Sequence, residues 1–558
     1  MHRLRFLTTF SIVVLVIAGF FAASGRGQTT TSPRRLLSRF APPAVQSGIS
    51  PDLSHAPGTP ETLRRQSIRR TGATIDRVGA SGARYRPGRV IVKFRDGVSA
   101  ATRLSALSVV SGRATMSPRA ASQDFDVVNI DQAADAEAVA RAFRGRPDVE
   151  YAQAAYRVHA EFVPNDAFYP TQWNLPFINL EAGWDIQPAA GSAITVAVLD
   201  TGVAYMGGKI PFHADAFTID SDGNVGPPGS GGTSYPALGD MVLDFVAATE
   251  LQPFSRFVKA HDFIWDDETP LDLSGHGTHV SGTIGQLTNN RGTGLGDVAN
   301  DGGTAGVAFN VKLMPVKVIS GEWDDIFGSP EAGTDDVVAR GIRYAADNGA
   351  NIINMSIGEE GPPNCGVNPN QDGCAPAIEA AIRYAVGKGV FVAIAGGNSF
   401  DTGNKTEVLS EIASRVPGAV SVAAVNRAKG HPFYSTTGTY IELAAPGGEF
   451  GGFGDQGGIL QQTLDLNLVN TFDLSPSQFV RPRFDALKYF YFVGTSQSTP
   501  HVSGLAAMLM QQGVTNPAAI EAALEKFATD LGTPGRDSTF GFGLVDARAT
   551  LRGLGLAK

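Results

Sequence analysis

From residue 194 onward, short apolar runs alternate with amphipathic segments, and this alternation limits the folds open to the chain. The apolar runs are ITVAVLD (194–200), VKLMPVKVI (311–319), NIINMSI (351–357), VFVAIAG (390–396) and AVSVAAV (419–425). Helical patterns lie between or after them, at 276–287, 334–349, 376–389 and 499–512. Continuous Val/Ile-rich runs with intervening helices are what a parallel sheet covered on both faces requires. The sequence therefore predicts a doubly wound α/β fold with a mostly parallel sheet.

Charge is distributed unevenly along the 558 residues, whose formal net charge is −9. Residues 1–158 carry roughly +12 and residues 159–558 roughly −21. The hydrophobic fraction of 43% is ample for a buried core and excludes wholesale disorder. The acidic total gives no reason to expect a nucleic-acid partner. The opposite signs suggest an N-terminal segment that docks on the rest of the chain.

The N-terminus has the pattern of a secretory signal peptide, which we place at residues 1–25. Arg3 and Arg5 precede an apolar run from Phe6 to Phe21, and small residues follow. The run is short for a membrane span, although an uncleaved anchor is the alternative. Residues 26–85 are rich in Arg, Ser, Pro and Gly without a sustained period, and are interpreted as a basic low-complexity linker. The pattern predicts a secreted, extracellular protein, with a periplasmic or envelope location as the alternative.

A small α+β module is predicted for residues 86–160. Three strand-like segments, GRVIVKF, DFDVVNI and VEYAQAAYRVHAEF, alternate with two helical ones, AATRLSALSVV and DAEAVARAFRG. A module of this size can fold by itself.

Four residues at the expected loop edge of the large sheet have side chains suited to catalysis. In doubly wound sheets, chemistry gathers at the carboxyl ends of the strands. Asp200 closes the first apolar run, where a buried carboxylate can orient a histidine, and His276 opens a glycine-flanked helix as a candidate general base. Ser496 lies before an apolar helix, where a hydroxyl can act as a nucleophile, and Asn398 follows two glycines, where its amide can donate to an oxyanion. Taken singly, each residue also has a structural interpretation.

Together, in the order Asp, His, Asn, Ser, these residues resemble the subtilisin-like serine proteases. The motifs that carry the resemblance are VAVLDTGV, HGTHVSGTI, INMSIG, AGGN and GTSQSTPHVSG. The resemblance implies that Asp200 orients His276, that His276 is general base and then acid, that Ser496 attacks, and that Asn398 binds the oxyanion. It also implies that Ser356, Ile357 and Gly358 pair with the substrate backbone.

The resemblance extends to the N-terminal module, which is similar to the inhibitory, folding-assisting propeptide of such enzymes. It implies a secreted, self-processed serine endopeptidase, with residues 161–558 as the catalytic domain. Its partners would be protein or peptide substrates and its own propeptide, and we expect a monomer with no membrane association after signal cleavage. The change of pattern predicts processing between about Arg157 and Pro170.

The chain departs from the family pattern in three places. Gln497 and Ser498 stand where the family usually has Met and Ala, which changes the packing under the nucleophile. Insertions are predicted near 205–257 and 461–489. Either insertion could form a flap over the cleft, but surface decoration is favoured.

A calcium site is possible in the acidic loop before His276. Ca²⁺ needs six to eight oxygen donors, and Asp262, Asp267 and Thr269 look like ligands that some subtilases use in this loop. Trp265 and Leu271 occupy positions where such sites offer oxygen, which argues against Ca²⁺, and a solvated acidic loop is the alternative. The chemistry itself requires no cofactor.

Cys365 and Cys374, the only cysteines, lie in a Pro/Gly-rich loop and are predicted to form a disulfide in an exported protein. His276 and His279 do not have the spacing of a zincin motif. His279 and His501 are assigned to packing.

Two other functions fit parts of the sequence. Asp-Thr-Gly occurs at Asp200 and at Asp401, as in a two-lobed aspartic protease, but the second copy does not follow an apolar strand. A catalytically inactive subtilase fold used for binding is the second alternative.

Overall fold

The computed structural model describes two compact units, residues 77–156 and 162–553. The described residues are 77–78, 84–119, 123–156, 162–221, 223–289, 303–473 and 475–553. The predicted signal peptide, most of the predicted linker, and residue 157 lie outside them. None of the helices among the described residues is long and apolar enough to cross a membrane.

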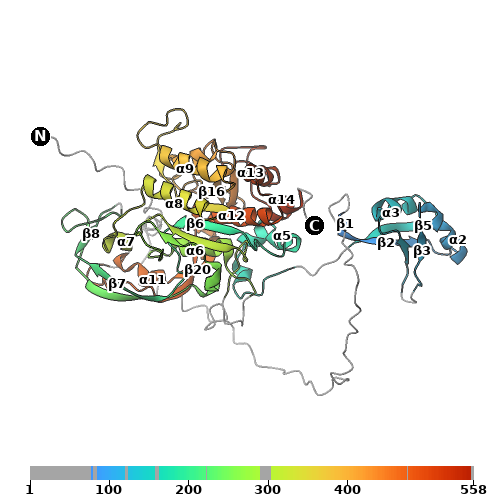
Figure 1. The fold of residues 1–558 in the computed structure, drawn as a ribbon, viewed down its shortest axis with the longest axis horizontal. Coiled ribbons are helices and arrows are strands. Elements are labelled where there is room, and N and C mark those ends of the chain that lie inside the picture. Colours follow the sequence, from blue (N-terminus) through green and yellow to red (C-terminus); the bar gives the residue numbers. More distant parts are fainter. Residues whose placement is uncertain are drawn as a thin grey trace, which may run out of the picture. The chain divides into compact units, whose positions relative to one another are not determined.

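The N-terminal unit is an antiparallel sheet carrying two α-helices (Figure 1). The long strand β2 (Arg84–Phe94) pairs with β4 (Asp126–Ile130) and β5 (Val149–Tyr156), and the unit also contains β3 (Ala114–Met116), α2 (Ala100–Ser105) and α3 (Ala136–Arg144). Alternate residues of β2, Val90 and Val92, are buried with Phe143 of α3. Asp135 caps α3 because its carboxylate accepts hydrogen bonds from the first-turn backbone N–H groups.

The unit begins earlier than the sequence indicated. Strand β1 (Arg77–Val78) pairs antiparallel with residues 84 and 85 of β2, so the predicted start at residue 86 is too late. A strand of two residues is too short to show an apolar period, so the sequence pattern could not reveal it.

The second unit is built on a seven-stranded, fully parallel sheet, which confirms the predicted fold class. Its strand order is β12-β13-β6-β14-β16-β18-β19. The strands are β6 (Thr195–Asp200), β12 (His261–Asp262), β13 (Lys312–Lys317), β14 (Ile352–Met355), β16 (Phe391–Ala395), β18 (Ala419–Val425) and β19 (Leu443–Pro446). The chain passes from β13 over β6 to β14, so the strand order reverses beside β6. A crevice for ligands is expected at the carboxyl ends of the strands there.

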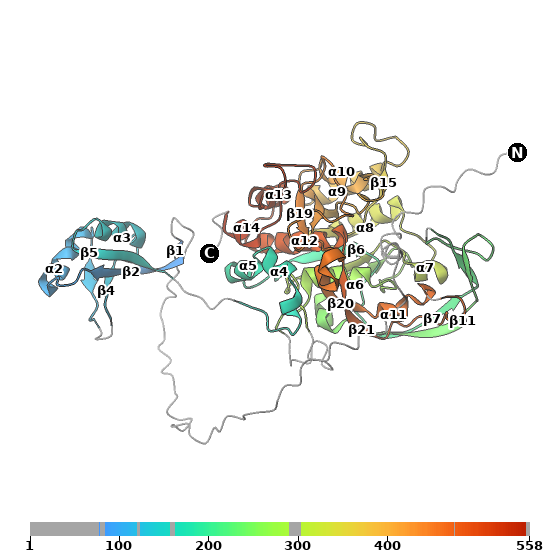
Figure 2. The same ribbon diagram turned by 180° about the vertical axis from the view of Figure 1, so that it is seen from behind.

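Helices cover both faces of this sheet (Figures 1 and 2). On β6, Val196 and Val198 face one apolar cluster, and Ala197 and Leu199 face another, as the two-residue period of a strand requires. The first cluster includes helices α6 (His276–Gly285) and α12 (Thr495–Gln511), and the second includes α8 (Asp335–Asp347), α9 (Pro376–Gly387) and α10 (Val408–Ala413). The remaining main helices are α5 (Leu180–Ile186), α13 (Pro517–Lys526) and α14 (Ala547–Gly553).

The two predicted insertions pack against each other. The first contains the antiparallel pair β7 (Gly208–Ala214) and β11 (Gly239–Phe245) and a small sheet of β8 (Phe217–Ile219), β9 (Val225–Gly226) and β10 (Thr233–Tyr235). The second lies within the hairpin β20 (Ile459–Leu464) and β21 (Leu487–Phe492) and carries α11 (Leu466–Val469). Phe245 stacks on Phe484 with ring centroids 5.0 Å apart, and Tyr235 donates a hydrogen bond to the Phe472 carbonyl at 2.6 Å. The insertions therefore form one substructure, gathered at the end of the unit away from α9 (Figure 2).

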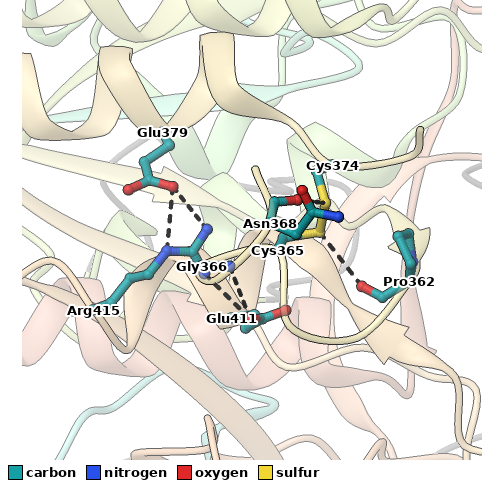
Figure 3. Close-up of a disulfide and its surroundings, with 8 residues drawn as sticks. All are labelled: Pro362, Cys365, Gly366, Asn368, Cys374, Glu379, Glu411 and Arg415. Atoms are coloured by element: carbon teal, nitrogen blue, oxygen red, sulfur yellow. Dashed lines mark hydrogen bonds and ion pairs between the residues drawn. A yellow bond between two sulfur atoms is a disulfide. The ribbon is translucent and has the colours of Figure 1, made fainter. Parts of the chain in front are cut away.

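The predicted disulfide is present (Figure 3). Cys365 and Cys374 are bonded, with their Cα atoms 5.5 Å apart, in the loop between β15 (Glu360–Gly361) and α9. Arg415 pairs with Glu379 at 2.7 Å and with Glu411 at 3.5 Å beside that loop. The bond closes a short loop, so it constrains a local segment and does not hold the fold together.

Three glutamates gather where helix α13 meets the strand β19 edge. Carboxylate oxygens of Glu442, Glu521 and Glu525 lie within 4.8 Å of one another, and Arg536 is the cation near them. Burial raises the pKa of Glu442 to about 8 and that of Glu525 to about 7, and it also raises the pKa of Glu521.

This cluster predicts that the protein loses stability as the pH rises. Between the ordinary glutamate pKa and about pH 8, the folded chain binds more protons at these sites than the unfolded chain, so the free energy of unfolding falls as pH increases. Between pH 5 and pH 9, the free energy of unfolding should fall by about 1 kcal/mol or more less in Glu442→Gln than in the parent protein. Denaturant unfolding at a series of pH values checks this, and an unchanged slope in the variant would contradict it.

Candidate active site

Four segments distant in the sequence meet at the carboxyl edge of the parallel sheet and line one cavity of about 110 Å³. Asp200 is the last residue of β6, His276 is the first of α6, and Ser496 is the second of α12. Asn398 follows β16 by three residues. The structure thus brings together all four residues that the sequence singled out for catalysis.

Asp200 and His276 are in direct contact. The Nδ1 atom of His276 lies 2.7 Å from Oδ1 of Asp200, which is 1% exposed and also accepts a hydrogen bond from the Thr201 backbone N–H at 2.8 Å. Burial alone would lower the pKa of His276, but the Asp200 charge outweighs it and raises that pKa above its ordinary value. This contact assigns the proton of the neutral imidazole to Nδ1 and leaves Nε2 as the basic nitrogen.

Glycines let the helix of His276 approach Asp200 closely. A Cβ on Gly277 would lie 2.1 Å from the Gly202 carbonyl oxygen and 3.1 Å from Oδ1 of Asp200. Gly275 has φ of 94°, a left-handed conformation that favours glycine. The Gly275 carbonyl accepts a hydrogen bond from the Thr463 hydroxyl of β20, so the second insertion stabilises the start of this helix.

Ser496 is linked reciprocally to Ser356, which follows β14. The Ser496 hydroxyl donates to the Ser356 carbonyl oxygen at 3.0 Å, and the Ser356 hydroxyl donates to the Ser496 carbonyl oxygen at 2.8 Å. Pro500 explains the second bond, because a proline four residues along the helix has no N–H to give to the Ser496 carbonyl. The predicted substrate strand therefore supplies the donor that the helix lacks.

Asn398 is held in one orientation by Thr495. Its Oδ1 accepts hydrogen bonds from the backbone N–H and the hydroxyl of Thr495, at 2.9 and 3.0 Å. Because Oδ1 is occupied in this way, the amide nitrogen is the group left to serve as a donor toward the cavity. Sequence reasoning missed Thr495, which looked only like a residue preceding the nucleophile.

The predicted substrate segment also lines the cavity. Ser356, Ile357 and Gly358 are among its lining residues, together with Ala395, Gly397 and Asn398. Among the described residues of the two insertions, none lines this cavity. The described part of the two insertions therefore forms no wall of this cavity.

The two departures in the serine motif, Gln497 and Ser498, are buried directly after Ser496. Gln497 is 2% exposed and Ser498 is fully buried, and the Gln497 carbonyl contacts Nδ1 of His501 at 2.8 Å. Burial lowers the pKa of His501 to about 4 and that of His279 to about 3, so both rings are neutral and serve packing.

The predicted calcium ligands do not converge. Among the described residues, the only group of three or more His, Cys, Asp or Glu side chains with donor atoms within 4.8 Å is the glutamate cluster, not this loop. Oδ1 of Asp262 accepts from the Ile264 and Trp265 backbone N–H groups, and Oδ1 of Asp267 accepts from the Thr269 N–H. The side chains of Asp262 and Asp267 thus already serve the loop backbone.

A lysine supplies positive charge at this place. Lys317, at the end of β13, is fully buried and donates to Oδ1 of Asp324 at 2.6 Å and to the Leu271 carbonyl at 2.9 Å. Burial alone would lower the pKa of Lys317, but the charges of Asp324, Asp262 and Asp272 outweigh it and raise that pKa. The residues therefore do not fit a calcium site. Sequence reasoning missed Lys317 because a lysine closing an apolar strand looks like a surface residue.

We therefore expect the Asp262 loop to give no calcium response. Calcium should shift the Tm of an Asp267→Ala variant as much, or as little, as that of the parent, because the Asp262 and Asp267 carboxylates do not converge and already accept hydrogen bonds from the loop backbone. Thermal unfolding across a calcium titration measures this, and a calcium-dependent rise that disappears in the variant would restore the site.

The two Asp-Thr-Gly copies do not meet. Asp401 is exposed in a turn and does not line the cavity, whereas Asp200 is buried at its edge. The carboxylate pair that an aspartic protease needs is not formed by these residues, so that alternative is wrong.

Comparisons with known proteins agree with the site's residue types. The model of the Subtilase family matches residues 191–543, and that of the fervidolysin N-terminal prodomain matches residues 73–154. The chain is 29% identical to a thermophilic serine proteinase of Bacillus sp. (strain AK1) over 464 residues, 83% of this chain and 87% of the relative. It is 29% identical to an extracellular protease of Xanthomonas campestris pv. campestris over 446 residues, 76% of this chain and 63% of that relative. Among solved structures, a protease from Pseudoalteromonas arctica is 26% identical, covers 70% of this chain and 99% of its own, and has a TM-score of 0.48.

Proposed function

Because the chain belongs to the Subtilase family and is a subtilisin-like serine protease with a prodomain, we propose that it cleaves peptide bonds through Ser496, His276 and Asp200. The observation that carries this proposal is that these three side chains and Asn398, from four separate segments, line one cavity. The 2.7 Å contact between Asp200 and His276 supports their roles.

The reaction we propose is acyl transfer. The Ser496 hydroxyl leaves the Ser356 carbonyl by rotating about its Cα–Cβ bond, and Nε2 of His276 takes its proton as Oγ attacks the substrate carbonyl carbon. The Asn398 amide and the Ser496 backbone N–H donate to the oxyanion that forms. His276 then protonates the leaving amine, and water releases the acyl group by the same steps in reverse order.

A fluorophosphonate probe tests this proposal. It reacts with an activated serine, so it should label folded, processed protein at Ser496, with the site identified by mass spectrometry of the digested protein. Heat-denatured protein is the control and should not be labelled. Labelled Ser496 supports the protease. Absence of label in folded protein would favour the alternative of a subtilase fold used only for binding.

We further propose that the protein is exported and processes itself. A relative named an extracellular protease and the prodomain support this, and contacts made just after the N-terminal unit support a cleavage site at or before Phe162. Phe162 contacts Trp184 and Phe309 with ring centroids 5.4 and 5.7 Å apart, and its backbone N–H donates to Asp185 at 3.0 Å.

The mature N-terminus should lie at or before Phe162. Cleavage after that residue would remove a partly buried aromatic side chain that packs against the core of the catalytic unit, at a cost of about 1 to 2 kcal/mol. N-terminal sequencing of active enzyme checks this. A start beyond Phe162, or residue 26 intact in active material, would contradict the processing we propose.

A further inference from the structure

Glu407 is a buried acidic residue of the candidate active-site cavity. Glu407 lines the same cavity as His276 and Ser496, although it is only 4% exposed. It ends the short strand β17 (Thr406–Glu407), which pairs with β15, so its position is fixed by the backbone. Sequence reasoning assigned it no role, because a glutamate in front of an apolar helix looks like a helix cap.

Two glycines let this carboxyl group pack against two of the segments that line the cavity. A Cβ on Gly358 would lie 2.6 Å from Oε2 of Glu407, and a Cβ on Gly397 would lie 3.1 Å from the same atom. Gly358 belongs to the predicted substrate segment and Gly397 to the segment of Asn398. A side chain that enters between these two segments therefore meets the Glu407 carboxyl group, since Gly358 and Gly397 themselves have no side chain to cover it.

The surroundings of Glu407 are acidic. Asp200, Glu322 and Glu360 also line the cavity, and no lysine or arginine is among its described lining residues. Burial raises the pKa of Glu407 well above its ordinary value, and the charges of Glu359 and Glu360 raise that pKa further. A cationic group entering the cavity would compensate the negative charge of the Glu407 carboxylate and form a charge-assisted hydrogen bond.

We propose that Glu407 makes this enzyme select substrates with arginine or lysine immediately before the scissile bond. The inference rests on the proposed function, which determines where the substrate residue before the scissile bond lies. Ser496 attacks the carbonyl carbon of the residue before the scissile bond, and the oxyanion faces Asn398. The side chain of that same residue extends from the reaction centre into the adjoining cavity, where Glu407 lies.

A purely structural role for Glu407 makes a different prediction. Its carboxylate also accepts a hydrogen bond from the Glu359 backbone N–H and so supports a turn beside the cavity. Glu407→Gln keeps an acceptor for that N–H and removes the charge. The substitution should therefore leave the turn intact and affect only substrates that carry a positive charge.

The experiment measures kcat/KM on peptides that differ only in the residue before the scissile bond, with arginine, lysine, phenylalanine or leucine there. Active enzyme is quantified by fluorophosphonate titration. We expect the parent enzyme to favour arginine and lysine by about 10-fold or more. Glu407→Gln should lower kcat/KM on these two by about 30- to 100-fold and change that on phenylalanine and leucine by less than about 3-fold.

Glu442→Gln is the matched control, because Glu442 is another buried glutamate with a raised pKa that does not line the cavity. It should leave the order of preference unchanged. Benzamidine, an aromatic amidinium, provides a test that needs no variant, and it should inhibit the parent enzyme competitively.

Several outcomes would overturn the inference. These are a parent preference for phenylalanine or leucine, an equal loss on all four peptides in Glu407→Gln, or no competitive inhibition of the parent by benzamidine. In each case, fluorophosphonate labelling at Ser496 would show that the proposed function still stands. Absence of labelling would instead mean that the proposed function itself has failed.

Discussion

Replacing Ser496 by alanine is expected to lower kcat by about 10⁶-fold, the size known for enzymes with this triad, while the protein stays folded. The substitution removes the nucleophile. It also removes the hydrogen bond from Oγ to the Ser356 carbonyl, but the bond from the Ser356 hydroxyl to the Ser496 carbonyl remains. Single-turnover kinetics on a peptide substrate and circular dichroism measure the two effects.

Asp200→Asn gives the prediction a sharper form. Alone, it should lower kcat by about 10⁴-fold, because an amide nitrogen facing Nδ1 of His276 favours the wrong imidazole tautomer. Added to Ser496→Ala, it should cause no further loss, since residues that act as a unit are not additive. Losses that add in full would show that the contact between Asp200 and His276 has no part in the reaction of Ser496.

Ser498→Ala is the control for the serine substitution. Ser498 lies two residues along the same helix and is fully buried, and its hydroxyl has no hydrogen-bond partner among the residues that the structure describes. The variant should keep fluorophosphonate labelling and kcat within about 3-fold, because removing an unsatisfied buried hydroxyl costs little. A loss equal to that of Ser496→Ala would mean that packing under the helix, and not the nucleophile, explains both results.

Lys317→Met is expected to destabilise the catalytic unit by about 3 to 5 kcal/mol. Methionine fills a similar volume but removes the ammonium group that Asp324 accepts from at 2.6 Å. Asp324, Asp262 and Asp272 would then lie buried without a cation, and breaking one side of a buried ion pair leaves the other charge uncompensated. Denaturant unfolding of the fluorophosphonate-inhibited enzyme measures the change.

Lys312→Met is the matched control for this prediction. Lys312 begins the same strand but is exposed, so its replacement should change the free energy of unfolding by no more than about 0.5 kcal/mol. A double variant, Lys317→Met with Asp324→Asn, should recover part of the loss, because one of the uncompensated charges is then removed. Equal stability of the two methionine variants would show that the buried pair contributes nothing.

The Lys317 network also reaches the active site. Oδ2 of Asp324 accepts a hydrogen bond from the Gly321 N–H at 2.8 Å, and Gly321 lines the catalytic cavity. Trp265 donates to Oδ1 of the same aspartate at 2.7 Å. The loop that the sequence suggested for calcium is therefore joined to the cavity wall by a lysine and an aspartate on neighbouring segments.

The sequence by itself determined the parallel sheet and the residue types that meet at the candidate site. Apolar runs such as 194–200 have the length and composition of buried strands, and a residue that closes such a run must lie at the carboxyl edge of the sheet. The positions of Asp200, Asn398 and Ser356 follow from this rule. Glycines around His276 indicated close backbone approach for the same reason, since local conformation depends on local residues.

Only the tertiary structure decided which side chains from different segments meet at the carboxyl edge of the sheet. Glu407, Lys317 and Thr495 have no local pattern that marks them, because their roles depend on groups far away in the chain. Glu407 faces Gly358 and Gly397, and Lys317 faces Asp324 and the carbonyl of Leu271. A charge buried by folding acquires its partner only when separate segments pack together, and that packing depends on the whole chain, not on the spacing of residues within one segment.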